Sequence, residues 1–308
     1  MIVNRRGLFV LVAGLGLASA TPAAASPRVS TIEVCRGPGA VAVNSTTGEV
    51  YVAGEDTVTI AGRRDIAIGR PDDLAIDEYT GRVYVTNRTA GTVTVLEADG
   101  DVRSVVPCGP GATAPDVDAE TSRLYVGSAS AGCVAVVDTI ASVVDTLLTG
   151  PVKGFDTVRV NPAAQLGYLS SPATNTVEVL DLPSGKFTAS VPVGKTPTGL
   201  AVHEASNTVY VANSGIHHLS VVDGDARTER ATILLRSEAS SVAVHQASHT
   251  VYTNGGPDGI VKIDGATGEI SGELSLGINP GQVAVHQGTK TVYVTDPVHG
   301  LLHVITDF

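Results

Sequence analysis

A short phrase centred on tyrosine recurs along the chain, and its spacing constrains the fold more than any other feature. Residues 207–213 read NTVYVAN and residues 81–87 read GRVYVTN. The central residues of the seven copies are Tyr51, Tyr84, Tyr125, Tyr168, Tyr210, Tyr252 and Tyr293. Successive copies are 33, 41, 43, 42, 42 and 41 residues apart. A period near 40 residues with strand-like content predicts a propeller or a solenoid.

Each repeat contains four strand-like segments separated by turn residues. In the fifth repeat these segments are residues 200–203, 208–211, 218–223 and 231–235. Four short strands per repeat predict one blade of a β-propeller. The segments are apolar on both faces, as a sheet covered by neighbours on both sides requires. The sequence therefore predicts an all-β, seven-bladed propeller with four-stranded antiparallel blades.

The two ends of the chain predict how the ring closes. The last repeat has strand patterns at 282–286, 291–296 and 301–306, and then the sequence stops without a fourth. Residues 30–35, followed by Arg36-Gly37-Pro38-Gly39, resemble the missing strand. We expect this N-terminal strand to complete the seventh blade, because closure removes an open sheet edge. The first repeat is short, and we expect a tight turn at residues 62–64 rather than a missing strand.

The first 25 residues have the features of an export signal. Arg5-Arg6 precedes an apolar run at 8–20 and a small-residue stretch that predicts cleavage after Ala25. The arginine pair fits a twin-arginine signal, and general secretion remains the alternative. We therefore expect a signal peptide at 1–25, one propeller domain at 26–308, and a secreted or periplasmic protein. No second apolar run of membrane length follows, so the mature chain is expected to be soluble, without a membrane span.

Charge and cysteine content narrow the possible partners. Removing residues 1–25 leaves 18 basic and 31 acidic residues, a formal charge of −13. Nucleic acid is not an expected partner, because an acidic surface repels phosphates. The three cysteines exclude a disulfide-dense scaffold. Cys108 and Cys133 fall in neighbouring repeats, and either a bridge between them or free buried thiols is compatible with the sequence.

The repeat resembles that of a known family. Tyr84-Val85-Thr86-Asn87 is a complete Tyr-Val-Thr-Asn motif, and residues 210–213 and 293–296 are near matches. The pattern is similar to the YVTN family of secreted or surface-layer β-propellers, which includes the YncE-like proteins. The likeness spans essentially the whole mature chain. It implies a propeller fold and a binding or cell-surface role.

Two departures from the repeat suggest a ligand site. Five repeats carry alanine at the centre of the first strand, whereas the third and fourth carry Asp116 and Arg159. One interpretation is a buried Asp116–Arg159 ion pair, because an isolated buried charge is costly. The other is an arginine that faces the central channel and binds a carboxylate or a phosphate.

Two loops near the same end of the channel supply further candidates for ligand binding. The loop before the fourth repeat contains Lys153, Phe155 and Asp156, and a loop of the fifth contains His217 and His218. Phe155 is notable because the mature chain has few aromatic residues outside the repeat tyrosines and no tryptophan. Ordinary solvated loop residues are the alternative interpretation.

Two residue sets could bind metal. His203, His245 and His286 share one repeat position, where other repeats carry Asn or Asp, so turn capping competes with transition-metal binding. Asn87, Asn213 and Asp296 end the second strand of their repeats. Oxygen ligands from separate blades can bind calcium in lactonase-type propellers. Calcium is thus a candidate cofactor, although the same asparagine also belongs to the structural repeat.

These observations favour an exported binding or interaction module that holds its ligand or partner at the channel mouth. A protein or a small anionic ligand is the expected partner, and a monomer is the expected state. The alternative is a divalent-metal-dependent hydrolase or lactonase that uses the channel. Nucleophilic catalysis has little support, because the sequence contains no Gly-x-Ser-x-Gly motif.

Overall fold

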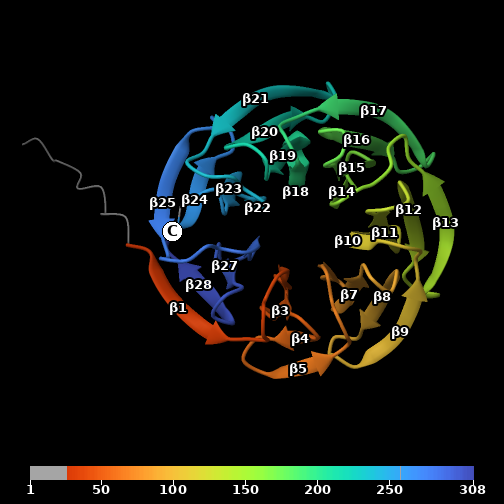
Figure 1. Cartoon of the computed structure of the whole chain (residues 1–308), viewed down its shortest axis with the longest axis horizontal. Coiled ribbons are helices and arrows are strands. Elements are labelled where there is room, and N and C mark those ends of the chain that lie inside the picture. The colour runs from red at the N-terminus through yellow and green to blue at the C-terminus, as the bar shows by residue number, and fades with distance from the viewer. Residues whose placement is uncertain (1–25, 257) are drawn as a thin grey trace, which may run out of the picture.

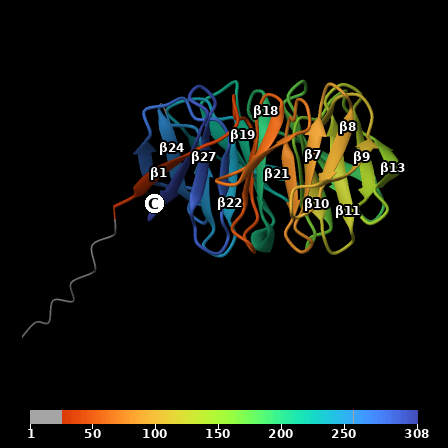
Figure 2. The ribbon, with the colours of Figure 1, turned by 90° about the horizontal axis from the view of Figure 1, so that it is seen from below.

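Seven four-stranded sheets surround a central axis in the computed structural model, which describes residues 26–256 and 258–308 (Figure 1). The predicted signal peptide lies outside the described residues. Viewed from the side, the ring is a disc whose loops gather on its two faces (Figure 2). The prediction of a seven-bladed propeller is confirmed.

The first four blades follow one another in the sequence, and in each the first strand is innermost. Blade 1 contains β2 (Val41–Val43), β3 (Val50–Ala53), β4 (Thr57–Ile60) and β5 (Arg64–Ala67). Blade 2 contains β6 (Leu74–Asp77), β7 (Arg82–Asn87), β8 (Thr92–Leu96) and β9 (Val102–Pro107). Blade 3 contains β10 (Ala112–Asp118), β11 (Arg123–Ser128), β12 (Cys133–Asp138) and β13 (Val143–Thr149). Blade 4 contains β14 (Val158–Asn161), β15 (Leu166–Ser171), β16 (Thr176–Asp181) and β17 (Lys186–Pro192).

The remaining blades repeat this plan until the ring closes. Blade 5 contains β18 (Pro197–His203), β19 (Thr208–Asn213), β20 (His218–Asp223) and β21 (Thr228–Leu234). A short 3-10 turn, Glu204–Ser206, links β18 to β19. Blade 6 contains β22 (Val242–His245), β23 (Thr250–Thr253), β24 (Gly259–Asp264) and β25 (Ile270–Ser275). Blade 7 contains β26 (Val283–Val285), β27 (Val292–Asp296), β28 (Leu301–Thr306) and, from the other end of the chain, β1 (Arg28–Glu33).

The N-terminal strand closes the ring, as expected. β1 pairs antiparallel with β28, from Arg28 opposite Thr306 to Glu33 opposite Leu301. Figure 1 shows the red strand beside the blue one. The chain then crosses to blade 1, where the backbone N–H of Cys35 donates to Oγ1 of Thr59 at 2.9 Å. Closure therefore joins the first and last blades without leaving β28 as an open edge.

The repeat tyrosines form the packing between blades. Tyr51, Tyr84, Tyr168 and Tyr210 are completely buried. Tyr210 of blade 5 belongs to the same apolar cluster as Val242 and Val251 of blade 6. Aromatic side chains bury a large apolar area, so one tyrosine per blade fills the wedge between two sheets. This role explains the regular spacing of the repeat.

Blade 1 is short because its outer turn is trimmed. β4 and β5 are joined at Gly62, which has a φ of +71°, and the backbone N–H of Arg63 donates to the carbonyl of Ile60 at 2.9 Å. Glycine adopts this conformation without a steric penalty. The four-stranded sheet is complete, as the sequence predicts.

All three cysteines are free, with Cys35 and Cys108 buried and Cys133 half-buried. The free-thiol interpretation thus agrees with the structure. Burial raises the pKa of the Cys108 thiol to about 12. Among the described residues, none of the helical segments has the length and apolar character needed to cross a bilayer.

Candidate functional site in the central channel

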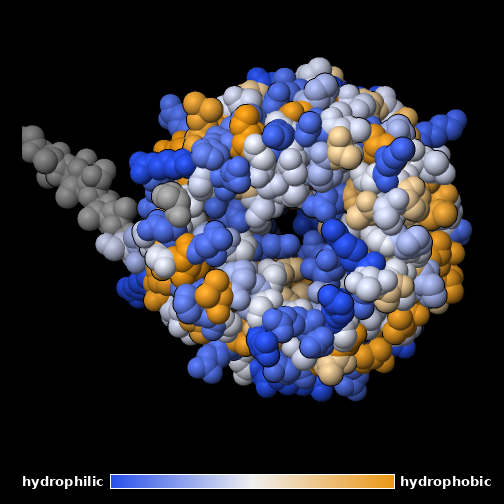
Figure 3. Space-filling view, viewed as in Figure 1, coloured by the Kyte–Doolittle hydropathy of each residue, from blue (hydrophilic) through white to orange (hydrophobic). Residues whose placement is uncertain are grey.

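The innermost strands of the seven blades enclose a central cavity of about 540 Å³. Figure 3 shows its opening, bordered mainly by hydrophilic residues. The residue opposite each repeat tyrosine lies on this wall. It is Ala75 in blade 2, Asp116 in blade 3 and Arg159 in blade 4. Two adjacent blades therefore bring opposite charges into a wall that is otherwise lined by alanine at this level.

Asp116 and Arg159 do not form the ion pair that the first interpretation predicted. Oδ2 of Asp116 accepts a hydrogen bond from the backbone N–H of Val160 at 2.7 Å, so this carboxylate bonds to the exposed edge of β14. Nη1 of Arg159 donates to the carbonyl of Val158 at 2.7 Å. Within the described residues, no carboxylate oxygen lies within 4.0 Å of a side-chain nitrogen of Arg159. The guanidinium thus keeps most of its donors free inside the cavity.

Asp73, which the sequence analysis did not select, is the second important residue of the channel. It directly precedes β6 and lines the cavity, half-buried. Burial raises the pKa of Asp73 to about 6; Arg159 opposes the shift, whereas Asp72 and Asp156 add to it. The sequence carried a signal, because the position before the innermost strand is otherwise occupied by small or neutral residues such as Ala40. A comparison of the seven repeats at the position two residues before the central alanine identifies Asp73 as the charged exception.

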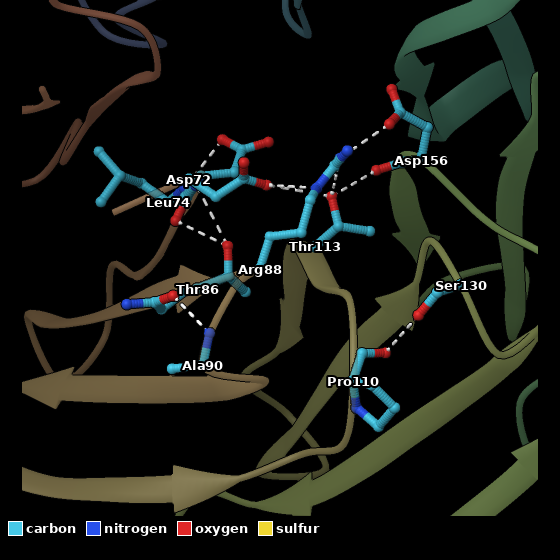
Figure 4. Close-up of polar contacts among 11 residues, drawn as sticks. Asp72, Leu74, Thr86, Arg88, Ala90, Pro110, Thr113, Ser130 and Asp156 are labelled. Carbon is cyan, nitrogen blue, oxygen red and sulfur yellow. Dashed lines mark hydrogen bonds and ion pairs between the residues drawn. The ribbon is translucent and has the colours of Figure 1, made fainter. Parts of the chain in front are cut away.

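Arg88 spans one mouth of the channel and connects three blades (Figure 4). It follows β7, and its Nε lies 3.4 Å from Oδ2 of Asp72. Its Nη2 lies 3.0 Å from Oδ1 of Asp156 and 2.9 Å from Oγ1 of Thr113. Burial lowers the pKa of Arg88, but the two carboxylates outweigh burial and raise it. We call Asp72, Asp73, Arg88 and Asp156 the charged mouth.

The opposite mouth is built from hydrogen bonds between blades. In blades 5, 6, 7 and 1, a backbone N–H in the turn after the innermost strand donates to a side chain of the next blade. Glu204 donates to Gln246 at 3.0 Å, Gln246 to Gln287 at 2.8 Å, and Gln287 to Ser45 at 3.0 Å. Ser45 donates to Glu78 at 3.0 Å. These hydrogen bonds link neighbouring blades. We call this end of the channel, with Ser45, Glu78, Glu204, Gln246 and Gln287, the belt mouth.

The other predicted ligand-binding residues lie in different environments. Asp156 is at the charged mouth, where burial raises its pKa and Arg88 opposes the shift. Phe155 is a core residue, only 1% exposed, and its ring stacks on Phe187 with centroids 5.6 Å apart. Lys153 is exposed and lies outside the cavity wall. The expectation that these three residues form one patch is therefore corrected, because the loop turns Phe155 inward.

His217 and His218 also lie outside the cavity wall. His217 lies in the loop between β19 and β20, and His218 is the first residue of β20. The carbonyl of His217 accepts a hydrogen bond from the backbone N–H of Leu235 at 2.9 Å. This loop belongs to the rim of blade 5 rather than to its innermost strand. The two histidines therefore do not join Arg159.

The three residues predicted as calcium ligands do not come together. Asn87, Asn213 and Asp296 end the second strands of blades 2, 5 and 7, and none lines the channel cavity. Asn87 caps its own loop through Ala90, Asn213 is fully buried, and Asp296 accepts from Nδ1 of His299 at 2.7 Å. Among residues 26–256 and 258–308, no three His, Cys, Asp or Glu side chains are grouped as metal ligands. Calcium binding stays a prediction, and these residues do not define a shared site for it.

The repeated histidines serve the turns between the first and second strands. Nδ1 of His203 is 2.7 Å from Oγ of Ser206, and Nδ1 of His245 is 2.8 Å from Oγ of Ser248. Nδ1 of His286 accepts from the backbone N–H of Gly288 at 3.0 Å. The imidazoles thus do what Asn and Asp do in the other blades, in agreement with the capping interpretation.

The raised pKa of Asp73 predicts a pH dependence of the stability of the protein. Its pKa in the folded chain lies above the ordinary value, so protonation of this carboxyl favours folding. That contribution is complete below about pH 4 and is lost as the pH rises through about 6. We expect Asp73→Asn, which cannot ionise, to be more stable than the parent at pH 7.5, by on the order of 1 kcal/mol after allowance for partial exposure.

The measurement is urea unfolding of both proteins at pH 4 and at pH 7.5. The advantage of the variant should shrink toward zero at the lower pH. The matched control is Asp72→Asn, which removes a partner of Arg88 and should destabilise the protein at pH 7.5. A loss of stability in Asp73→Asn at pH 7.5 would contradict the prediction.

Comparisons with known proteins support the fold. No family model matches the sequence, and a search of curated proteins finds no match. Among solved structures, the chain is similar to selenomethionine-substituted virginiamycin B lyase from Staphylococcus aureus, with a TM-score of 0.77 at 10% sequence identity. The match covers 91% of this chain and 99% of the lyase chain. At this identity the likeness carries the fold alone.

Proposed function

We propose that this chain is an exported binding protein that holds a small ligand with an anionic group in its central channel. Arg159 supplies the main contact. The observation that carries the proposal is the free guanidinium of Arg159 inside a cavity of about 540 Å³. Export and the relation to the YVTN family belong to the proposal, and they are supported by residues 1–25 and by the tyrosine repeat.

The cavity has the size and the polar groups of a small-molecule site. Ligand pockets commonly enclose roughly 300–1,000 Å³ and place a few polar groups on a rigid wall. Arg159 stands on β14, between β10 and β18, so the backbone that carries it is held on both sides. A guanidinium binds a carboxylate or a phosphate through two parallel N–H donors. The charge therefore faces the cavity from a pre-organised position.

Arg88 forms ion pairs with other side chains, whereas Arg159 does not within the described residues. Arg88 is already neutralised by Asp72 and Asp156 and serves the architecture of the mouth. Arg159 bonds only to the neighbouring carbonyl of Val158 among the described residues. Arg159 is half-buried and its remaining donors lie at the cavity, where a ligand can reach them.

The test is a binding screen with small probes: inorganic phosphate, succinate and the dipeptide Ala-Ala. Thermal shift identifies the probes that stabilise the parent protein, and calorimetry measures their affinity. We expect Arg159→Ala to weaken the best probe by about 10- to 100-fold, because hydrogen bonds to charged groups contribute roughly 1.5–3 kcal/mol. Arg159→Lys should recover part of the affinity, since it restores the charge without the two-pronged geometry.

The control variant is Arg36→Ala, which removes an exposed arginine that pairs with Glu55 on the rim. It should leave every affinity unchanged. Equal affinity of Arg159→Ala and the parent for all binding probes would refute the proposed site. Circular dichroism of each variant excludes a trivial loss of folding.

A further inference from the structure

We propose that the ligand carries a positive group as well as an anionic one: a small ammonium carboxylate, between a free amino acid and a dipeptide in size. In this arrangement Arg159 holds the carboxylate and Asp73 holds the ammonium group. This inference rests on the proposed function and specifies its ligand class.

The channel wall keeps an excess of acidic side chains after its internal ion pairs are counted. The acidic side chains on the cavity wall are Asp72, Asp73, Asp116, Asp156, Glu78 and Glu204, and its arginines are Arg88 and Arg159. The charge of Arg88 is taken by Asp72 and Asp156. Arg159 is therefore left in a cavity with an excess of carboxylates. A ligand with only negative charge would be attracted by Arg159 but repelled by these carboxylates.

The acids on the wall differ in how far their carboxylates are already engaged. Oδ1 of Asp73 accepts from the backbone N–H of Leu74 at 2.8 Å, and its Oδ2 has no hydrogen-bond partner within the described part of the chain. Oδ2 of Asp116 is occupied by Val160. Glu78 accepts a belt hydrogen bond at the far mouth. Asp116 is thus held against the next blade, and Glu204, whose carboxylate has no hydrogen bond within the described residues, lies at the belt mouth. Asp73 is the acid of the charged mouth whose carboxylate bonds to no other blade.

Several neutral polar groups around these two residues form hydrogen bonds between blades. The hydroxyl of Thr157 donates to the carbonyl of Thr198, and Oγ of Ser241 accepts from the backbone N–H of Val283 at 3.0 Å. The Thr113 hydroxyl donates to the carbonyl of Asp156 at 3.0 Å. These groups are already used between blades. Arg159 and Asp73 are therefore the two charged side chains on this part of the wall that, among the described residues, bond to no other blade.

The placement of this pair determines the kind of ligand. Asp73 belongs to blade 2 and Arg159 to blade 4, with β10 of blade 3 between them. The two residues influence each other electrostatically, yet they do not come within ion-pair distance. A molecule with an ammonium group at one end and a carboxylate at the other satisfies both residues and bridges the gap. A single charge satisfies one residue and leaves the other unpaired.

The experiment compares three matched probes by calorimetry at pH 7.5. Free Ala-Ala has both charges, N-acetyl-Ala-Ala has only the carboxylate, and Ala-Ala amide has only the ammonium group. We expect the parent protein to bind the free dipeptide at least tenfold more tightly than either blocked form. Asp73→Asn should abolish its preference over the N-acetyl form, and Arg159→Ala should abolish its preference over the amide.

The outcomes separate this inference from the proposed function. If N-acetyl-Ala-Ala binds as tightly as the free dipeptide and still requires Arg159, the anion site stands and the zwitterion is refuted. If the amide binds best and does not require Arg159, both proposals fail. Failure of all three probes to bind also overturns the assignment of this ligand class. The urea unfolding of Asp73→Asn described above shows whether that variant is folded.

Discussion

Deletion of residues 26–34 is expected to produce the largest loss of stability of any change considered for this protein. The deletion removes β1, opens blade 7 and exposes β28, where Leu302 and Ile305 are now fully buried. It also removes the six-residue pairing between Arg28 and Glu33 on one strand and β28 on the other. We expect a loss on the order of 5 kcal/mol or more, a large fraction of the stability of a typical domain.

The measurement is a thermal unfolding scan, in which such a loss corresponds to a fall in Tm of at least about 10 °C. The control returns the deleted segment behind Phe308 through a short turn. This rearrangement is geometrically simple, because Arg28 already lies opposite Thr306. Recovery of most of the lost stability would show that strand pairing, not the covalent connection to blade 1, is responsible. A shortened chain with an unchanged Tm would contradict ring closure by β1.

Replacement of Asn207 by alanine is expected to have the second largest effect. Oδ1 of Asn207 accepts from the hydroxyl of Tyr168 at 2.7 Å and from Nδ2 of Asn161 at 2.9 Å. Its Nδ2 donates to Asp225 at 2.8 Å. Removing this side chain leaves two buried donors without their acceptor, and each costs about 1–3 kcal/mol. We expect Asn207→Ala to lower the free energy of unfolding by about 3 kcal/mol.

Gln165→Ala is the matched control for this prediction. Gln165 ends the corresponding turn of blade 4 and has a similar backbone conformation, with φ of +56° compared with +44° for Asn207. Its side chain is exposed and, in the part of the chain that the structure describes, bonds only to the carbonyl of Pro162 at 2.7 Å. Both substitutions place alanine at positive φ, so the difference between them isolates the buried network. Urea unfolding of the two variants should differ by at least about 2 kcal/mol, and equal losses would contradict the assigned role of Asn207.

The ring could be predicted from the sequence because its determinants are local and repeated. Each blade has one buried tyrosine, buried inner strands, a more exposed outer strand and turn residues between them, and this order recurs in every repeat. The strand that closes blade 7 was predictable because residues 30–35 occupy the place that the last repeat lacks. Local patterns are sufficient to predict the fold when every repeat packs against its neighbours in the same way.

The candidate site was only partly predictable. Asp116 and Arg159 stood out because they replace alanine at a position that the repeat defines. Whether they pair depended on the edge of β14, whose N–H at Val160 takes the carboxylate. The direction of Phe155 depended on the space beside Phe187, which lies in β17, the outermost strand of blade 4. No periodic pattern contains either contact.

The amino-acid sequence by itself determined the number of blades, their strand order and the closure of the ring, because these follow from spacing and from the alternation of strands and turns. Only the tertiary structure decided which charges in the channel neutralise one another. Arg88 is paired with Asp72 and Asp156, whereas Arg159 and Asp73 are left facing a cavity. The physical reason is that an ion pair requires two side chains within a few ångströms, and that distance is set by how three blades meet rather than by any one of them.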